Sequence, residues 1–460
     1  MDQEFESLTS KNTRTLVPPP STDKVIGGMW RLVHKKKEFG EILKYKAQWV
    51  CFGNHQEHLV NYYDTYAAVA RLESFKILLS LMVNRKFLAY QFDVETAFLY
   101  GEMDAPNYVA QVANYEVPAD TDKCLFFNTD TTIFLHIHVD DGFIIGETAE
   151  LVELFLTQLS KSYSIKTKKQ PTQHLGYTLS WQTNGSVMLH QQDFCSKILE
   201  EFNMTSANPI KTPSPANIHN VVAQASMPFS NLTMQKAIGM LNYLALHTRP
   251  DIMFTTNLLS QFTNRPTAAH WSLVKHLLRY LNGTRFLGLH FTRTEHPESE
   301  LIGLADADYA TYLVTKKSHS GYVIMFLGNL VSWTTKKQPV VAQSTTEAEF
   351  ISMNKCSKEM RWLSNLLSTL NIKLKVPVLK NDNTGAIKIS KEAQLNPNSK
   401  HIEVQFQYLR DLVKKNLLTV KHSPTNDMVA DVLTKALGTV KHHQAIKLLR
   451  LVQSDKITGG

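Results

Sequence analysis

The stretch LIGLADADYATYLVTKKSHSGYVIMFLGNLVSWTTKKQPVVAQSTTEAEF, residues 301–350, decides the fold of the second half of the chain. Its alternating apolar residues predict three successive strands, at residues 301–305, 320–327 and 330–335. The first strand ends at Asp306. Apolar side chains then step by three or four from Phe350 to Leu370, which predicts a helix with Glu349 just before its first turn.

The pattern continues beyond this stretch with alternating strands and helices. A fourth strand is expected at residues 376–379, a helix at 401–415 and a fifth strand at 418–422. Asp382 follows the fourth strand, and Thr425 is expected to cap a further helix that carries Asp431. An Asp, a Glu and two further Asp on a central strand, a helix start, a strand end and a late helix can converge on one point. Hydrolysis of a phosphodiester by two metal ions needs such a set, because carboxylates are the ligands that Mg²⁺ takes.

A second set of carboxylates lies in the first half of the chain. Asp93 stands near the end of an apolar strand at residues 87–94, and a hairpin is expected at residues 132–145. Its turn is placed at Asp141-Gly142, so that Asp140 and Asp141 lie at the tip. Two readings stay open at this point, since an Asp-Asp-Gly is an ordinary turn as well as a metal site.

Composition limits the class of protein. Lys and Arg total 49 against 41 for Asp and Glu, a net charge of +8 that suits a polyanionic partner or simply a basic globular protein. The 460 residues indicate two to four domains. The four cysteines are far apart, which argues against a zinc knuckle and a disulfide framework and favours a reducing interior. The polar first residues exclude a signal peptide, and no run approaches the roughly 18 apolar residues of a membrane span, so no membrane partner is expected.

The chain divides into five stretches. They are a polar arm at 1–23, a mixed stretch at 24–185, a largely helical stretch at 186–295, an alternating strand and helix stretch at 296–440, and a basic helical tail at 441–460. In the helical stretch, basic residues such as Arg249 are expected either to face a phosphate backbone or to lie on a solvated helix face.

The first half resembles the reverse transcriptases of copia-type LTR retrotransposons. The resemblance rests on MWRLVHKKKEFGEILKYKAQWV (29–50), YYDTYAAVARLESFKILLSL (62–81), YQFDVETAFLYGEM (90–103) and HVDDGFIIG (138–146). It implies truncated fingers and palm of a right-hand polymerase, with Asp93, Asp140 and Asp141 as the polymerase carboxylates and metal ligands. It also implies that Lys46 is a nucleotide-binding residue of the fingers.

This half departs from the family pattern. A Leu-Tyr-Gly-Leu-Lys-Gln block is absent, and the chain is internally truncated near residues 119–122. The usual hairpin Tyr is His138, the usual Arg is Gln48, and Ala67-Ala68-Val69 stands for Ala-Pro-Val. These departures predict that polymerisation is impaired.

The second half resembles the ribonuclease H of the same polyproteins, joined to the polymerase by a helical connection. The resemblance rests on LADADYATYLVTKKSHSGY (304–322), VSWTTKKQPVVAQSTTEAEF (331–350), NDNTGAI (381–387), SKHIEV (399–404) and ADVLTKAL (430–437). It implies that Asp306, Glu349, Asp382 and Asp431 are catalytic metal ligands for two Mg²⁺, with Mn²⁺ as the alternative, while Glu347 and Asp308 are structural or surface residues.

The expected fold is therefore a multidomain α+β and α/β chain, with a mixed-sheet ribonuclease H-like domain after the truncated polymerase. The resemblance implies an RNA-directed DNA polymerase with ribonuclease H activity, whose partners are an RNA template, a DNA primer and an RNA–DNA hybrid, beside other polyprotein products. It also implies a cytoplasmic localisation, in association with virus-like particles. The alternatives are an inactive retrotransposon relic and a non-catalytic nucleic-acid-binding fragment.

Overall fold

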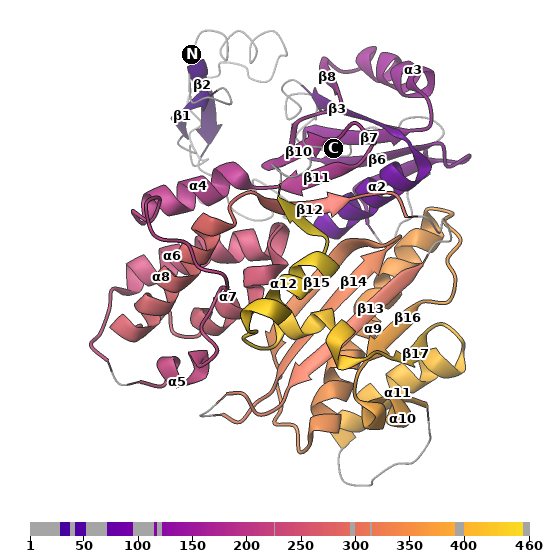
Figure 1. Cartoon of the computed structure of the whole chain (residues 1–460). Coiled ribbons are helices and arrows are strands. Elements are labelled where there is room, and N and C mark those ends of the chain that lie inside the picture. The colour runs from indigo at the N-terminus through magenta and orange to yellow at the C-terminus, as the bar shows by residue number, and fades with distance from the viewer. Residues whose placement is uncertain are drawn as a thin grey trace, which may run out of the picture.

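The structure is a computed structural model of the chain. It describes residues 28–36, 42–51, 71–94, 115–116, 122–224, 226–294, 300–312, 315–391 and 400–453. These residues form a mixed α/β arrangement with several sheets (Figure 1). Near the N-terminal end, β1 (Gly28–Lys36) and β2 (Ile42–Cys51) pair as an antiparallel ribbon. No helix in the described part of the chain is long and apolar enough to cross a membrane.

The first large sheet holds the hairpin that carries two of the expected carboxylates. Its order is β4-β5-β6-β7-β3-β8, with β3 at Leu88–Val94, β4 at Tyr115–Glu116, β5 at Leu125–Asn128, β6 at Ile133–His138, β7 at Asp141–Gly146 and β8 at Ile165–Lys169. One face packs on α2 (Leu72–Arg85), where Phe75 meets Phe143 edge to face. The other face packs on α3 (Ala149–Ser160), whose first turn is capped by Thr148.

The hairpin turn differs from the expected one by two residues. His138 pairs with Asp141, so the turn is Val139-Asp140 and not Asp141-Gly142. Val139 has a φ of 59°, a strained value for a β-branched residue. Gly142 lies inside β7, where an added Cβ would come within 2.2 Å of the Phe92 ring. Asp140 and Asp141 are still at the tip, as expected.

The second sheet is assembled from three separate parts of the chain. Its order is β18-β12-β11-β10-β9, with β9 at Gln173–His174, β10 at Tyr177–Trp181, β11 at Val187–His190, β12 at Leu287–Phe291 and β18 at Leu451–Gln453. The boundary expected at 185/186 falls in the turn between β10 and β11, which pair directly. The tail expected to be helical forms α12 (Thr439–Leu448) and then β18, which pairs with β12. Pairing between residues so far apart leaves no local signal.

A group of helices follows β11 in the chain and packs beside the third sheet, where α7 (Met253–Ser260) contacts β15 (Asn329–Lys337) (Figure 1). They are α4 (Gln192–Glu201), α5 (Ile218–Val222), α6 (Asn231–His247), the 3₁₀ turn η3 (Pro250–Ile252), α7 (Met253–Ser260) and α8 (Ala268–Gly283). Thr267 and His270 form a capping box at the start of α8. Arg249, expected on a surface, is fully buried between α6 and η3.

The third sheet has the order β15-β14-β13-β16-β17. Its strands are β13 (Leu301–Asp308), β14 (His319–Phe326), β15 (Asn329–Lys337), β16 (Val378–Asn381) and β17 (Thr419–His422). The first three strands are antiparallel, and β16 and β17 run parallel to β13. Its helical segments are α9 (Thr345–Thr369), α10 (Thr384–Lys391), α11 (Lys400–Lys414), η4 (Thr425–Asp427) and η5 (Val429–Leu433). Gly303 in β13 lets Cys356 and Met360 of α9 come close to the sheet.

Two elements near the expected carboxylates start elsewhere than the sequence suggests. The long helix begins at Thr345, where the Ser344 hydroxyl accepts the Glu347 amide, so Glu349 lies inside the helix rather than before it. Asp431 lies in the 3₁₀ segment η5 and not in an α-helix, since the regular helix α12 begins only at Thr439.

Candidate metal centre

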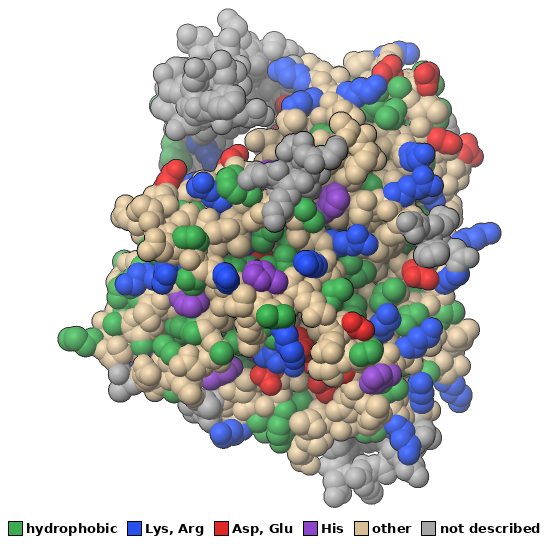
Figure 2. All heavy atoms as spheres, in the orientation of Figure 1, with side chains coloured by type: hydrophobic (Ala, Val, Ile, Leu, Met, Phe, Trp, Pro, Cys, Tyr) green, Lys and Arg blue, Asp and Glu red, His purple; other side chains and the backbone are tan. Residues whose placement is uncertain are grey.

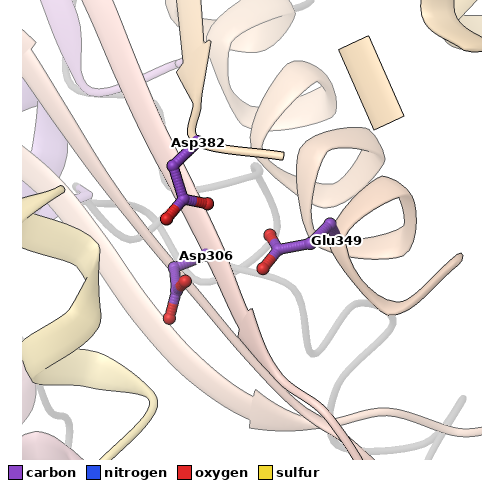
Figure 3. Close-up of side chains that lie close together, drawn as sticks. All are labelled: Asp306, Glu349 and Asp382. Carbon is purple, nitrogen blue, oxygen red and sulfur yellow. The ribbon is translucent and has the colours of Figure 1, made fainter. Parts of the chain in front are cut away.

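Three of the expected carboxylates meet near the C-terminal ends of two neighbouring strands of the third sheet, β13 and β16. Asp306 comes from the central strand β13, Glu349 from the second turn of α9, and Asp382 from the residue after β16 (Figure 3). One ligand oxygen from each lies within 4.8 Å of the other two. Among the residues that the structure describes, this is the one group of three or more potential ligand side chains that meets this distance. Asp306 and Glu349 are buried, and Asp382 is half-buried.

Hydrogen bonds from neighbouring side chains fix the orientation of the three carboxylates. Asn381 donates to the Glu349 Oε2 at 2.9 Å and to the Ala305 carbonyl at 2.8 Å, so one amide links α9 to β13. The Thr425 hydroxyl donates to the Asp382 Oδ2 at 3.0 Å. The Thr434 hydroxyl donates to the Asp306 Oδ2. Each carboxylate therefore has a partner that holds it in place, which a preorganised metal site requires.

Asp431, the fourth expected ligand, is buried nearby, and the Lys435 ammonium lies between it and Asp306. The Lys435 Nζ lies 2.9 Å from the Asp431 Oδ1 and 3.6 Å from the Asp306 Oδ2. The structure thus brings three of the four expected ligands together directly and places the fourth on the other side of an ammonium group. The sequence alone did not indicate Thr434 and Lys435 as site residues, although both lie in ADVLTKAL (430–437), the segment that carries Asp431.

Burial makes the cluster electrostatically unfavourable without a cation. Burial and the neighbouring carboxylates raise the pKa of Glu349 to about 9. Burial also raises the pKa of Asp306 to about 6, even though the Lys435 ammonium acts in the opposite direction. Burial raises the pKa of Asp431 as well. Charged carboxylates in such a place need a counter-charge, and an all-oxygen donor set suits a hard divalent cation. The residues present therefore fit such an ion.

The three carboxylates of the first half are neighbours without forming a comparable cluster. Asp93 of β3 pairs with Asp141 of β7, and the Val94 amide donates to the Asp140 carbonyl at 2.9 Å. Burial, together with the charges of Asp140 and Asp93, raises the pKa of Asp141. These three described side chains do not meet the ligand-distance criterion that the other three satisfy. The backbone of Lys46 lies in β2 opposite Val33, and its side chain lies outside the described residues.

Glu347 takes part in hydrogen bonds at the start of α9. Its carboxylate accepts the Gln343 amide at 2.7 Å, while its own amide donates to the Ser344 hydroxyl at 3.1 Å, so it stabilises the first turn of α9. Asp308 ends β13, two residues beyond Asp306, and burial raises its pKa.

Positive charge is distributed over the face of the molecule shown in Figure 2. Lys and Arg side chains lie in several separate groups across this face, and acidic groups lie between some of them. The net charge of +8 is therefore not concentrated in a single stripe on this face.

Comparisons with known proteins find two matching segments of one family. Residues 11–131 and 125–216 match the family described as reverse transcriptase (RNA-dependent DNA polymerase). The chain is 30% identical over 95% of its length to the retrovirus-related Pol polyprotein from transposon TNT 1-94 of Nicotiana tabacum. It is equally 30% identical over 95% of its length to the corresponding polyprotein from transposon RE1 of Arabidopsis thaliana. The chain spans about a third of these relatives, 36% and 32% of their lengths.

Several solved structures also match part of the chain. One of them is the crystal structure of an RNase H1 from the halophilic archaeon Halobacterium salinarum, which is 13% identical. The match covers 29% of this chain and 94% of that one, with a TM-score of 0.21.

Proposed function

The chain belongs to the family of Pol polyproteins of copia-type retrotransposons, and from this premise we propose that residues 296–440 are a ribonuclease H that cuts the RNA strand of RNA–DNA hybrids. The observation that carries the proposal is the cluster of Asp306, Glu349 and Asp382 at the edge of a mixed sheet. The three antiparallel strands, with Asp306 on the central strand and two further strands parallel to it, support the proposal of a ribonuclease H-like domain.

The cluster is suited to hydrolysis of a phosphodiester. Asp306, Glu349, Asp382 and Asp431 would hold divalent cations, Mg²⁺ or Mn²⁺, two for each active site. When bound, such ions supply an activated water and stabilise the leaving 3′ oxygen. The protein contributes rigidity, because Asp306 is part of a paired strand and Glu349 is held by the Asn381 amide. It also contributes burial, which strengthens the attraction between the carboxylates and any cation.

The substrate of this site would be a hybrid rather than a single strand. A polymerase that copies RNA into DNA leaves an RNA–DNA hybrid as its product, and the same family membership relates the first half of the chain to such polymerases. A nuclease in the same polypeptide can act on that product. We therefore expect an RNA template, a DNA primer and the hybrid as partners.

The polymerase is the second proposed activity, with Asp93, Asp140 and Asp141 as its carboxylates and Lys46 among the fingers residues. The pairing of Asp93 with Asp141 favours it, because it brings Asp93 next to the tip of the hairpin, where Asp140 and Asp141 lie. The missing block between Asp93 and Asp140, which are only 47 positions apart, argues that this activity is impaired. Extension of a DNA primer on an RNA template tests it, and extension lost in Asp141→Asn would support it.

The nuclease is tested by cleavage of a labelled RNA–DNA hybrid with Mg²⁺. We expect metal-dependent cleavage that is abolished by a chelator and reduced more than about a hundredfold in Asp382→Asn, since loss of a partner outside the ligand shell already costs roughly ten- to a hundredfold. Asp411→Asn is the matched control, because Asp411 is an exposed carboxylate paired with Lys415 on α11. Absence of cleavage by folded wild-type protein would refute the nuclease and leave a retrotransposon relic or a binding fragment.

A further inference from the structure

An ammonium group lies between two of the carboxylates proposed to hold metal. The Lys435 Nζ is 2.9 Å from the Asp431 Oδ1 and 3.6 Å from the Asp306 Oδ2. The Asp306 side chain is 2% exposed and that of Asp431 is 8%, whereas Lys435 keeps 36% of its side chain in contact with solvent. The ammonium is thus shared between two buried carboxylates while its stem reaches them from the solvent side.

The backbone holds Lys435 in this position. The amides of Thr434 and Lys435 both donate to the Asp431 carbonyl at 3.1 Å, which places Lys435 one helical turn beyond Asp431. This segment also packs tightly on β14, because a Cβ added at Gly321 would come within 2.7 Å of the Leu433 Cβ. The approach of the ammonium is therefore built into the fold of η5 rather than made by a free surface side chain.

The electrostatics favour a permanently charged lysine here. Burial alone would lower its pKa, but the carboxylates of Asp306 and Asp431, with Asp308 beyond them, raise the pKa of Lys435 above its usual range. The ammonium supplies one positive charge to a place where two carboxylates meet. A divalent ion between the same two carboxylates would supply two charges, so the ion and the ammonium would compete for one place.

We propose that Lys435 is an internal counter-ion that occupies the place of the second divalent ion between Asp306 and Asp431 in the metal-free protein. The proposal rests on the nuclease function proposed above. The first ion would then bind at Asp306, Glu349 and Asp382, and the second would bind only after the ammonium moves aside. The two ions would bind in a fixed order with separated affinities, and the second site would stay closed at low concentrations of free metal.

The test is the binding of Mn²⁺ to the full chain without nucleic acid, counted by electron paramagnetic resonance of the free ion. We expect wild type to bind one ion tightly and a second one weakly. In Lys435→Met the dissociation constant of the second ion should fall by about tenfold or more, because the positive charge that competes with the ion for this place is removed. Lys435→Arg keeps the charge and should keep the second site weak.

The matched control is Lys415→Met, which removes a lysine from an exposed Asp–Lys pair of the same i,i+4 spacing at the C-terminal end of α11. It should bind Mn²⁺ as wild type does. Lys435→Gln is a second neutral variant for the case that Lys435→Met does not fold, which circular dichroism detects. A second ion bound equally or more weakly in the neutral variants than in wild type would overturn the inference while leaving hybrid cleavage untouched. Failure of wild type to bind any Mn²⁺, together with no cleavage, would instead refute the proposed nuclease.

Discussion

The buried pair Arg249 and Asp251 offers the sharpest test of how the helical part of the chain is held together. Both side chains are 0% exposed. The guanidinium donates from Nε and Nη2 to the two carboxylate oxygens of Asp251 at 2.9 and 2.8 Å, and from Nη1 to the Thr284 carbonyl at 2.9 Å. Arg249→Met would leave the Asp251 charge buried, with the Tyr280 hydroxyl still donating to it at 2.7 Å but without the guanidinium. We expect a loss of about 3–5 kcal/mol in the free energy of unfolding.

The double variant Arg249→Met/Asp251→Leu should be more stable than Arg249→Met alone. It removes both charges, and apolar side chains of similar volume can replace a buried ion pair at little cost. The Tyr280 hydroxyl would still have the His442 Nε2 as a partner at 2.9 Å. We expect the double variant to recover at least about 1 kcal/mol, a non-additive result of the kind that contacting residues give.

The assay is urea unfolding followed by circular dichroism, with hydrogen exchange of peptides from α6 and α8 to locate the loss. Lys415→Met is the control, because its partner Asp411 is exposed and such surface pairs are worth less than about 1 kcal/mol. The reasoning is refuted if Arg249→Met costs no more than this control. It is refuted equally if the two single changes simply add in the double variant.

Two further results are expected. Burial lowers the pKa of His174 to about 3 and that of His136 to about 4, so both are neutral in the folded chain. Because the unfolded chain binds these protons below its pKa of about 6.5, the stability of the fold should decrease as the pH falls below that value. The melting temperature of His174→Phe should decrease less between pH 7 and pH 4.5 than that of wild type, and an equal decrease would contradict this. Gly303→Ala should lower the free energy of unfolding by about 1–3 kcal/mol through overpacking, because the added Cβ would lie 2.5 Å from the Met360 Sδ. A melting temperature equal to that of wild type would contradict this and show that the Met360 side chain moves aside at no cost.

The order of elements in the second half of the chain could be predicted because its signals are local. Alternation of apolar residues marked β13 and the two strands after it, and a three-to-four spacing marked α9. Asp306 was expected at the end of the first strand, Glu349 at the start of the long helix and Asp382 after the fourth strand, and this order of elements was the basis for expecting them to converge. Two starts were misplaced, those of α9 and of the helix expected to carry Asp431, because the ends of helices depend on capping contacts.

Features that depend on distant parts of the chain could not be predicted. Arg249 was expected at a surface, yet its environment is made by Thr284 and Tyr280, which lie about thirty residues away on and beside α8. The pairing of β18 with β12 joins residues more than 150 positions apart. Lys435 was visible in the sequence, but its place between two carboxylates depends on the close packing of η5 on Gly321.

The pairing of β12 with β18 has a mechanical consequence for the unit between them. Residues 296–440 leave the second sheet after β12, at Phe291, and the chain returns to the neighbouring strand at Leu451. Both ends of the unit are thus attached to adjacent, paired strands of the same sheet, rather than to the sheet through one connection. Rotation about a single connecting segment is not available to it, because both attachments would have to twist together. A large rotation of this unit relative to the second sheet would therefore have to strain both connections or break the pairing of β18 with β12.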